Sequence, residues 1–315
     1  MSEPGNIKNK SKKRFSWFSL LRLAGIVLFV IILFQVDLKA IWSEIREANL
    51  WYLLLAVLFQ ILLLFTKGIR WHLLNTSNQK QQTFQSLGEF FESYAMGVIT
   101  PGRLGELMKA GYQSKRETMI ASGIRVLAER GVDIGFFVFI AGAALYFGNM
   151  VPINSIYEVA TLIAGVLVFV IGILLFSSKK VNQFFDRFIN NYSLTFIPRK
   201  ASNIFNIIGL SLISNVFYFV SCYIIAAWGI ELNISVITVS AGVAIAGLLN
   251  LLPITIMGLG TREISFLYIF SAFPENQILA LSALIFIVAQ IGGGFIALIL
   301  GQFFLQISKR KSTNS

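Results

Sequence analysis

Long apolar runs alternate with short polar segments along most of this chain. Six of these runs are long enough to cross the hydrocarbon core of a bilayer as helices: 17–36, 50–69, 124–148, 156–176, 204–228 and 277–307. Three more, at 84–99, 234–251 and 262–272, adjoin a break that contains glycine or proline. The pattern predicts an all-α polytopic membrane protein with about six full transmembrane helices and two broken, re-entrant helical hairpins.

The first break has the sequence Thr100-Pro101-Gly102-Arg103-Leu104-Gly105-Glu106. Thr100 is a good helix N-cap, and Pro101 then takes the first helical position, where its missing N–H costs nothing. Gly102 and Gly105 allow another backbone to approach closely. The break therefore points the N-terminus of a helix, with its positive dipole end, and an arginine at one place.

A second break echoes the first far along the chain, as Gly258-Leu259-Gly260-Thr261-Arg262-Glu263. Gly258 and Gly260 permit a sharp reversal, and Thr261 can cap the helix that carries Arg262. Two helix N-termini and two arginines together outline an anion site. The residues that we expect to bind the anion, a lipid phosphate, are Arg103, Arg262, Thr100, Gly102, Gly260 and Thr261.

Basic residues set the predicted orientation in the membrane. Residues 1–16 form a basic tail that we expect to be disordered, residues 17–308 form the membrane domain, and residues 309–315 form a second basic tail. Most of the 26 lysines and arginines lie in these tails or in the segments on the same side of the membrane, which the positive-inside rule assigns to the cytoplasm. We therefore expect a multi-pass protein of the cell membrane with both termini in the cytoplasm.

Each half of the chain reads as two spans, a broken hairpin and a third span. Because three spans are an odd number, the second half would be inverted relative to the first, and the two breaks would meet near the bilayer midplane. Paired discontinuous helices of inverted repeats build the central sites of secondary transporters.

An arginine at membrane depth costs at least roughly 2.5–3.5 kcal/mol unless it is paired or hydrated. In one interpretation Arg103 and Arg262 bind a phosphate oxyanion. In the other, Arg103 pairs with Glu106, Arg262 pairs with a carboxylate of the other half, and both only hold the hairpins. Both interpretations can apply at once. Glu263 is adjacent to Arg262 and is expected to point elsewhere.

Other acidic residues lie in or near the two breaks. Glu106 and Glu263 could each be a proton-coupling carboxylate or a structural partner of arginine. Glu89 and Glu92 share a helix face and could line the cavity or occupy solvated positions on the entry side.

A charged stripe follows in the helix predicted for 124–148. Arg125, Glu129 and Asp133 recur at four-residue spacing, with Arg130 beside them, and a salt-bridged clamp against the first hairpin is the simplest interpretation. Asn250, just before the second break, could bond either the broken backbone or a ligand.

Composition narrows the function classes. The chain is 56% apolar and 13% charged, and Cys222 and His72 are its single cysteine and single histidine, which leaves little for zinc sites or for triad catalysis. No phosphate-binding loop, dinucleotide fingerprint or metal-ligand cluster occurs in the sequence, so no cofactor or metal is predicted. The formal net charge is +11, and the basic residues lie between apolar segments, which indicates contact with anionic lipid and not with nucleic acid.

Three motifs in order resemble one family: the Thr100 to Glu106 break, the Glu129-Arg130-x-x-Asp133 box, and the Gly258 to Glu263 break. The resemblance is to the membrane domain of lysylphosphatidylglycerol synthases, a flippase-like integral membrane family, and covers about 17–308. It implies a membrane part that moves a modified lipid between leaflets. Residues 94–98 depart from the family, in which an asparagine is expected before the proline.

The sequence thus predicts a lipid flippase that binds the phosphate of a phospholipid or of a polyprenyl-phosphate-linked lipid. The soluble transferase domain of the full-length synthases would follow the membrane domain, and because the chain ends at Ser315, we expect no lysyltransferase activity. Two alternatives remain open. The chain could be a membrane-embedded transferase for a lipid-linked substrate, or a non-catalytic subunit that serves an aminoacyl-lipid synthase or a glycosyltransferase.

Overall fold

The computed structural model describes residues 38–75, 83–113, 119–148, 163–168, 170–171, 201–251 and 258–313. These ranges contain helices and no strand, so the all-helical prediction is confirmed for them. The helices are α2 (Leu38–Glu47), α3 (Leu50–Asn75), α4 (Thr83–Ile99), η1 (Pro101–Leu107), α5 (Met108–Gln113), α6 (Met119–Gly148), α9 (Ala201–Tyr223), η2 (Ile224–Gly229), α10 (Val236–Leu249), α11 (Thr261–Ile269), α12 (Glu275–Ile285), η3 (Phe286–Gly292) and α13 (Gly293–Thr313).

Three helical stretches are long and apolar enough to cross a membrane: Leu50–Asn75, Phe205–Gly229 and Glu275–Arg310. The second of these stretches ends with the π-helical segment η2, and the third continues through the π-helical segment η3. The chain is therefore a membrane-embedded multi-pass protein. The predicted span 17–36 lies outside the described residues, as do most of the predicted span 156–176, the tail 1–16 and residues 252–257 of the second break.

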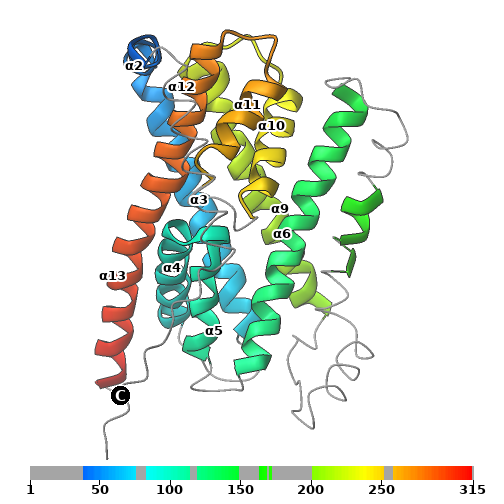
Figure 1. Cartoon of the computed structure of the whole chain (residues 1–315). Helices are drawn as coiled ribbons and strands as arrows, with labels where there is room; N and C mark the ends of the chain where they lie inside the picture. Colours follow the sequence, from blue (N-terminus) through cyan, green and yellow to red (C-terminus); the bar gives the residue numbers. More distant parts are fainter. Residues whose placement is uncertain are drawn as a thin grey trace, which may run out of the picture.

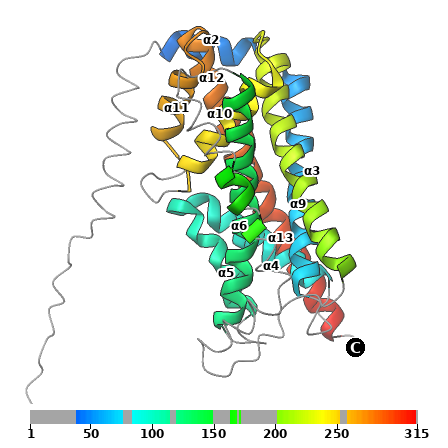
Figure 2. The same ribbon diagram turned by 90° about the vertical axis from the view of Figure 1, so that its right-hand side faces the viewer.

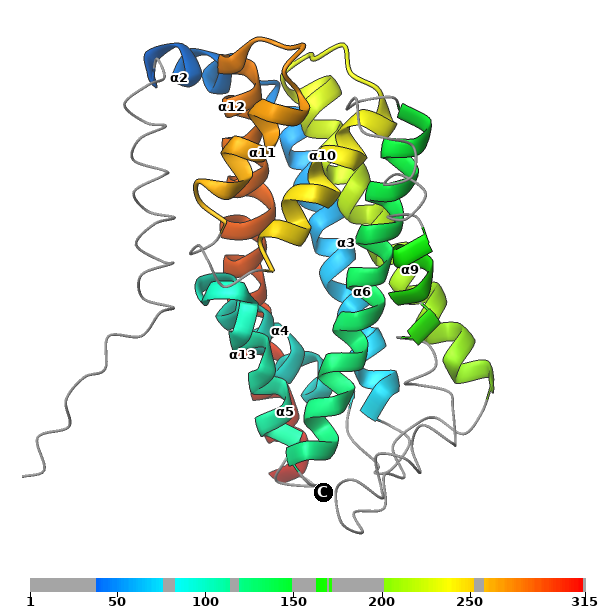
Figure 3. The same ribbon diagram turned by 45° about the vertical axis from the view of Figure 1, so that its right-hand side comes forward.

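Two short hairpins lie in opposite halves of the molecule. The first, α4 with η1 and α5, lies in the half that ends at the C-terminus, and the second, α10 with α11, lies in the other half (Figures 1 and 3). The long helices α3, α6, α9 and α12–α13 run past both. Helix α2 lies across the end that is remote from the C-terminus (Figure 2), where it packs against α12.

Small residues bring the first hairpin close to α13. A Cβ atom at Gly301 would lie 2.9 Å from the backbone nitrogen of Glu92, so the two helices approach as closely as their backbones allow. Ala297, one turn earlier on α13, is fully buried. Such contact stabilises helix pairs in lipid, where apolar burial alone supplies little driving force.

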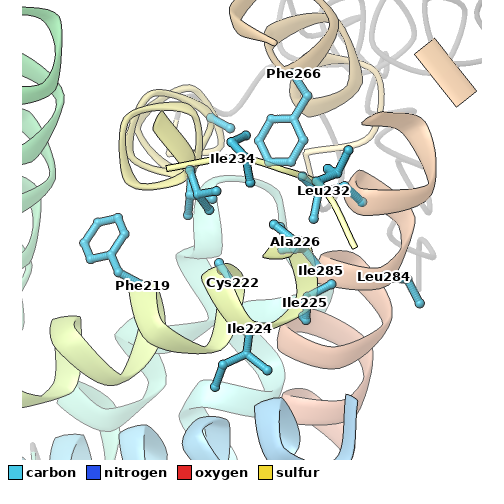
Figure 4. Packing of buried hydrophobic residues seen from close by; sticks show 14 of the residues in the cluster. Phe219, Cys222, Ile224, Ile225, Ala226, Leu232, Ile234, Phe266, Leu284 and Ile285 are labelled. Atoms are coloured by element: carbon cyan, nitrogen blue, oxygen red, sulfur yellow. The ribbon is translucent and has the colours of Figure 1, made fainter. Parts of the chain in front are cut away.

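A second packed region lies around the second hairpin. Phe219, Cys222 and Ile225 of α9 and η2 pack against residues of α10, α11 and α12 (Figure 4). Cys222 is 1% exposed and is a packed residue of this cluster. The cluster holds α11 and α12 against the long helix α9, and so it sets the position of the second break.

Two predicted boundaries differ from the structure. Helix α3 continues to Asn75, beyond the predicted span 50–69, so Arg70 is a buried residue of a long helix. The extra turns are stable because the guanidinium of Arg70 is neutralised by carboxylates of α6. Helix α13 extends to Thr313, which takes in most of the segment 309–315 that was predicted as a tail.

Candidate functional site

The first break is a tight turn with an unusual backbone. Gly102 and Arg103 have φ values of 58° and 55°, in the left-handed region, and at a non-glycine residue this conformation is costly. The hydroxyl of Thr100 accepts the Gly105 N–H at 2.7 Å and lies 3.0 Å from the carbonyl oxygen of Met96. A Cβ atom at Gly105 would lie 2.3 Å from that same oxygen, as the predicted close approach requires. The turn therefore folds back tightly on α4 and presents Arg103.

A cavity of about 80 Å³ opens beside this turn. Its wall combines cationic, amide and phenol side chains from helices that are far apart in the sequence. The lining residues are Gln60, Leu63, Lys67, Tyr94, Arg103, Arg130, Asp133, Ile134, Phe137, Asn215, Tyr218, Gly247, Asn250, Leu251 and Gln290. Arg103 comes from the first break, and Asn250 and Leu251 come from the entry to the second. The two hairpins thus contribute to one cavity, whose lining is partly polar and partly apolar, inside an apolar helical body.

Three charged side chains join the first turn to α6. The guanidinium of Arg103 lies 3.6 Å from the carboxylate of Glu106, and Arg130 pairs with the same carboxylate oxygen. The Arg103 guanidinium also lies 5.3 Å from the centre of the Tyr94 ring, a cation–π distance. Two arginines of the cavity wall therefore share one carboxylate.

A second set of ion pairs extends from this turn to α3. Lys109 pairs with Glu129 and lies 4.0 Å from Glu106. Arg70 donates to Glu129 at 2.8 Å and to both carboxylate oxygens of Asp133, at 2.6 and 3.0 Å. The clamp that the stripe on α6 suggested is thus present as direct contacts, and it reaches α3 as well as the first hairpin.

Lys67 completes the set, with its ammonium 2.9 Å from Asp133. The connected cations are Lys67, Arg70, Arg103, Lys109 and Arg130, and the connected carboxylates are Glu106, Glu129 and Asp133. Five positive and three negative groups give this network of described residues a formal excess of two positive charges, although each cation lies within ion-pair distance of a carboxylate. Lys67, Arg103, Arg130 and Asp133 of this network line the cavity, so its wall carries three cationic groups and one carboxylate.

The second break has a different environment. Arg262 is 3% exposed, donates to the Ser282 hydroxyl at 2.7 Å, pairs with Glu263, and lies 4.8 Å from the centre of the Phe286 ring. It is not among the described residues that line the cavity. Arg262 therefore belongs to a compact cluster that links α11 to α12 and η3.

Two expectations for this break were wrong. Glu263 was expected to point away from Arg262, but its side chain folds back toward the helix start, where it accepts the Gly260 N–H at 2.7 Å and pairs with Arg262. Thr261 was expected to cap the helix, but Gly260 is the N-cap residue and the Thr261 hydroxyl donates to the Gly258 carbonyl at 3.1 Å. A φ of 85° at Gly260 explains why Gly260, and not Thr261, is the N-cap residue, because the chain reversal needs glycine at that position.

Glu89 and Glu92 do not line the cavity. Glu89 is buried at 2% exposure, and its carboxylate accepts from Gln85 at 3.2 Å, so it is not a solvated entry residue. Glu92 accepts the Tyr112 hydroxyl at 2.5 Å within the first hairpin. Both carboxylates contribute to packing within or beside α4.

Sequence reasoning missed several members of the site. Lys67 and Arg70 are three residues apart at the end of an apolar run, a spacing that places both on one helix face and could have identified them. The neutral cavity residues Gln60, Asn215 and Gln290 carry no such signal, because each is an uncharged residue within an apolar run. Within the described residues no group of three or more histidine, cysteine, aspartate or glutamate side chains could hold a metal ion.

Comparison with known proteins adds one finding. The family model described as the lysylphosphatidylglycerol synthase TM region matches residues 18–297, which includes both breaks and the charged stripe on α6. No curated protein matches the chain.

Proposed function

This chain belongs to the family of the lysylphosphatidylglycerol synthase TM region, and from that premise we propose that it is a lipid flippase. Its substrate is a phospholipid or a polyprenyl-phosphate-linked lipid, whose phosphate enters the cavity between the two hairpins. The observation that carries the proposal is the excess of positive charge in the wall of that cavity, which has three cationic groups and one carboxylate. Excess positive charge inside an apolar body is costly, and a phosphate oxyanion would reduce that cost.

In this proposal the phosphate contacts three cationic groups. Arg103 and Arg130 offer guanidinium groups whose planar forks match phosphate oxygens, and Lys67 offers a point charge on the facing helix. Thr100 and Gly102 act by shaping the turn that presents Arg103. Arg262, together with Glu263, Gly260 and Thr261, holds the second hairpin in position.

The proposed architecture has six full spans and two re-entrant hairpins in two inverted repeats. The opposite placement of the hairpins and their shared cavity support this arrangement, because inverted repeats bring discontinuous helices to one central site. Both termini then lie in the cytoplasm and the protein lies in the plasma membrane, in contact with anionic lipids. Movement of the two halves about the cavity would expose the phosphate to each leaflet in turn.

Transport of fluorescent phospholipids and polyprenyl phosphates in proteoliposomes tests the proposal. We expect the wild type to equilibrate these lipids between leaflets, and the double variant Arg103→Gln with Arg130→Gln to be at least about 10-fold slower, since two charge-assisted contacts are lost. Arg46→Gln, on the exposed face of α2, is the matched control.

Two results would contradict the flippase function. One is a wild type that moves no phosphate-bearing lipid, and the other is a double variant that is as active as the wild type. In the first case the favoured function would be that of a membrane subunit of an aminoacyl-lipid synthase or of a glycosyltransferase, and the partner enzyme should copurify with the chain.

A further inference from the structure

Glu106 is a buried carboxylate whose two close partners both line the cavity. It is 6% exposed, and the guanidinium groups of Arg103 and Arg130 approach the same one of its carboxylate oxygens. The separation of 3.6 Å between Arg103 and Glu106 exceeds the length of a hydrogen bond, and the Arg130 nitrogen that faces Glu106 has no hydrogen-bond partner among the described residues. Charge, and not hydrogen bonding, therefore holds Glu106 to these two arginines.

The other carboxylates of the network have partners behind the cavity wall. Arg70 is 1% exposed, is not among the described lining residues, and pairs with both Glu129 and Asp133. Lys109, which is also 1% exposed and outside the wall, pairs with Glu129 and lies 4.0 Å from Glu106. A ligand in the cavity therefore leaves Glu129 and Asp133 with a cation, whereas it can take both close partners of Glu106.

A lipid phosphate would compete for both arginines. Its oxygens accept charge-assisted hydrogen bonds from guanidinium groups, often two in parallel, and such bonds are about twice as strong as neutral ones. Glu106 makes no hydrogen bond to either arginine, so the phosphate gains contacts that the carboxylate lacks. Occupation of the cavity by phosphate therefore separates Glu106 from Arg103 and Arg130.

The elements packed around Glu106 supply no replacement charge. On α4, Gly97 approaches the Glu106 side chain, and the Tyr94 ring faces Arg103. On α5, the ammonium of Lys109 lies 4.0 Å away and is already paired with a carboxylate of α6. A buried carboxylate that loses its counter-charges is costly, and it becomes neutral by binding a proton.

We propose that Glu106 is a proton-binding site and that each phosphate-bearing lipid crosses the membrane together with one proton. This inference rests on the proposed function, because it concerns the same cavity. When the phosphate reaches Arg103 and Arg130, the Glu106 carboxylate takes a proton from the water on that side. When the phosphate leaves on the other side, the arginines pair with Glu106 again and the proton is released there. For a phosphodiester lipid, one negative charge and one proton move together, so the step is electroneutral.

Proton uptake on lipid binding tests the inference without transport. Purified protein in detergent is titrated with dioctanoyl phosphatidylmethanol, whose phosphodiester stays ionised across the neutral pH range. Calorimetry in two buffers of different ionisation enthalpy gives the number of protons taken up. We expect about one proton per bound lipid, and an affinity that rises as the pH falls, by up to about 10-fold for each pH unit.

Variants locate the proton. Glu106→Gln should take up no proton, and its affinity for phosphatidylmethanol should be independent of pH. Glu92→Gln removes a carboxylate of the same hairpin that lies outside the cavity wall, so it should keep the proton uptake of the wild type.

Transport in proteoliposomes tests the coupling. A pH difference of about one unit should drive fluorescent phosphatidylmethanol to the alkaline side, to an asymmetry of about 10-fold, and a K⁺ diffusion potential should have no effect on the wild type. In Glu106→Gln the responses should be exchanged. The pH difference should have no effect, and the potential should move the lipid, because its charge then crosses without a proton.

Lipid binding by the wild type without proton uptake would overturn the inference, as would proton uptake that persists in Glu106→Gln. If Glu106→Gln does not fold, proton uptake and the response to the pH difference in the wild type decide the question. Scrambling that ignores the pH difference would remove the proton coupling and leave the flippase intact. Proton uptake on binding, without movement of any lipid, would overturn the flippase function and leave the proton site. A wild type that binds no phosphatidylmethanol would overturn both.

Discussion

Arg130 of α6 forms an ion pair with Glu106, in the turn of the first hairpin, and Arg103 approaches the same carboxylate oxygen. Space for this carboxylate comes from Gly97, where a Cβ atom would lie 2.4 Å from the Glu106 side chain. One negative group thus holds together two arginines that line the cavity. Under the proposed function, a phosphate in the cavity would compete with Glu106 for these guanidinium groups.

The variant Glu106→Gln should therefore be less stable without lipid and respond more strongly to lipid. Loss of the shared carboxylate leaves Arg103 and Arg130 to repel one another, which costs about 1–3 kcal/mol. An anionic lipid restores a counter-charge, and by mass action it stabilises the form that it binds. Thermal unfolding in detergent, with and without added phosphatidylglycerol, measures both effects.

Glu92→Gln is the matched control, since Glu92 lies in the same hairpin but outside the cavity wall. Its Tm increase on addition of lipid should equal that of the wild type. A Glu106→Gln protein whose Tm rises less with lipid than that of the wild type would show that Glu106 supports phosphate binding and does not compete with it.

Much of the fold follows from hydrophobic periodicity, because the long described helices coincide with predicted apolar runs, whereas α2 (Leu38–Glu47) and α5 (Met108–Gln113) lie outside every predicted run. The run 84–99 became α4 (Thr83–Ile99), and the run 262–272 became α11 (Thr261–Ile269). The end of α3 was missed for a physical reason. Lys67 and Arg70 resemble the basic residues that end a membrane span. Their ion pairs with α6 neutralise them, so that α3 can continue past them to Asn75.

The charged part of the site could be predicted and the neutral part could not. Arg103, Glu106 and Asp133 are conspicuous in an apolar sequence because charge is costly there. Gln60 and Gln290 are neutral, and their place in the cavity depends on how distant helices pack. Arg262 was expected to share the site of Arg103, but local pairing with Glu263 and Ser282 was enough to satisfy much of its charge.

Arg70 is the centre of the ion-pair network, and its removal should be severely destabilising. Arg70→Met leaves the carboxylates of Glu129 and Asp133 buried with one fewer cation, and such a loss costs about 3–5 kcal/mol. Arg70→Lys keeps the charge but cannot reach both carboxylates, so an intermediate loss is expected. Thermal unfolding should rank the proteins as wild type, Arg70→Lys, Arg70→Met, and Arg46→Met on the exposed face of α2 should match the wild type. Equal stability of Arg70→Met and the wild type would contradict the structural role of the network.

Gly105 and Gly111 provide a matched pair within the first hairpin. A Cβ atom at Gly105 would lie 2.3 Å from the Met96 carbonyl oxygen, whereas a Cβ atom at Gly111 would have no atom within 4 Å. Gly105→Ala must therefore displace the turn and should lower the free energy of unfolding by about 1–3 kcal/mol, the usual effect of overpacking. Gly111→Ala should stay within about 0.5 kcal/mol of the wild type. Equal effects of the two substitutions on thermal unfolding would show that the turn does not pack tightly on α4.

The proposed topology predicts which ends of the helices react from each side of the membrane. Cys222 is 1% exposed and should remain unlabelled by a membrane-impermeant maleimide, so the wild type supplies a silent background. In intact cells a cysteine that replaces Leu50, at the exposed start of α3, should be labelled at once. A cysteine that replaces Lys309, near the end of α13, should be labelled only after permeabilisation. The opposite pattern would place the termini outside, and labelling of both residues in intact cells would rule out the proposed path of the chain.

Backbone strain at Arg103 allows stability and function to be separated. The residue has a φ of 55°, a conformation that costs a non-glycine residue about 1–2 kcal/mol. Arg103→Gly removes that cost together with the guanidinium, so the protein should unfold at the same temperature as the wild type or above it. Scrambling of phosphate-bearing lipids should nevertheless fall at least about 10-fold, because a charge-assisted contact to phosphate is lost. Arg103→Lys, which keeps the strain and a positive charge, should be no more stable than the wild type and should retain part of its activity. If Arg103→Gly unfolds at a lower temperature than the wild type and scrambles lipid normally, the arginine holds the turn and does not bind lipid. Unchanged or higher stability together with slower scrambling is the result expected of a residue that is kept in a strained conformation for its ligand.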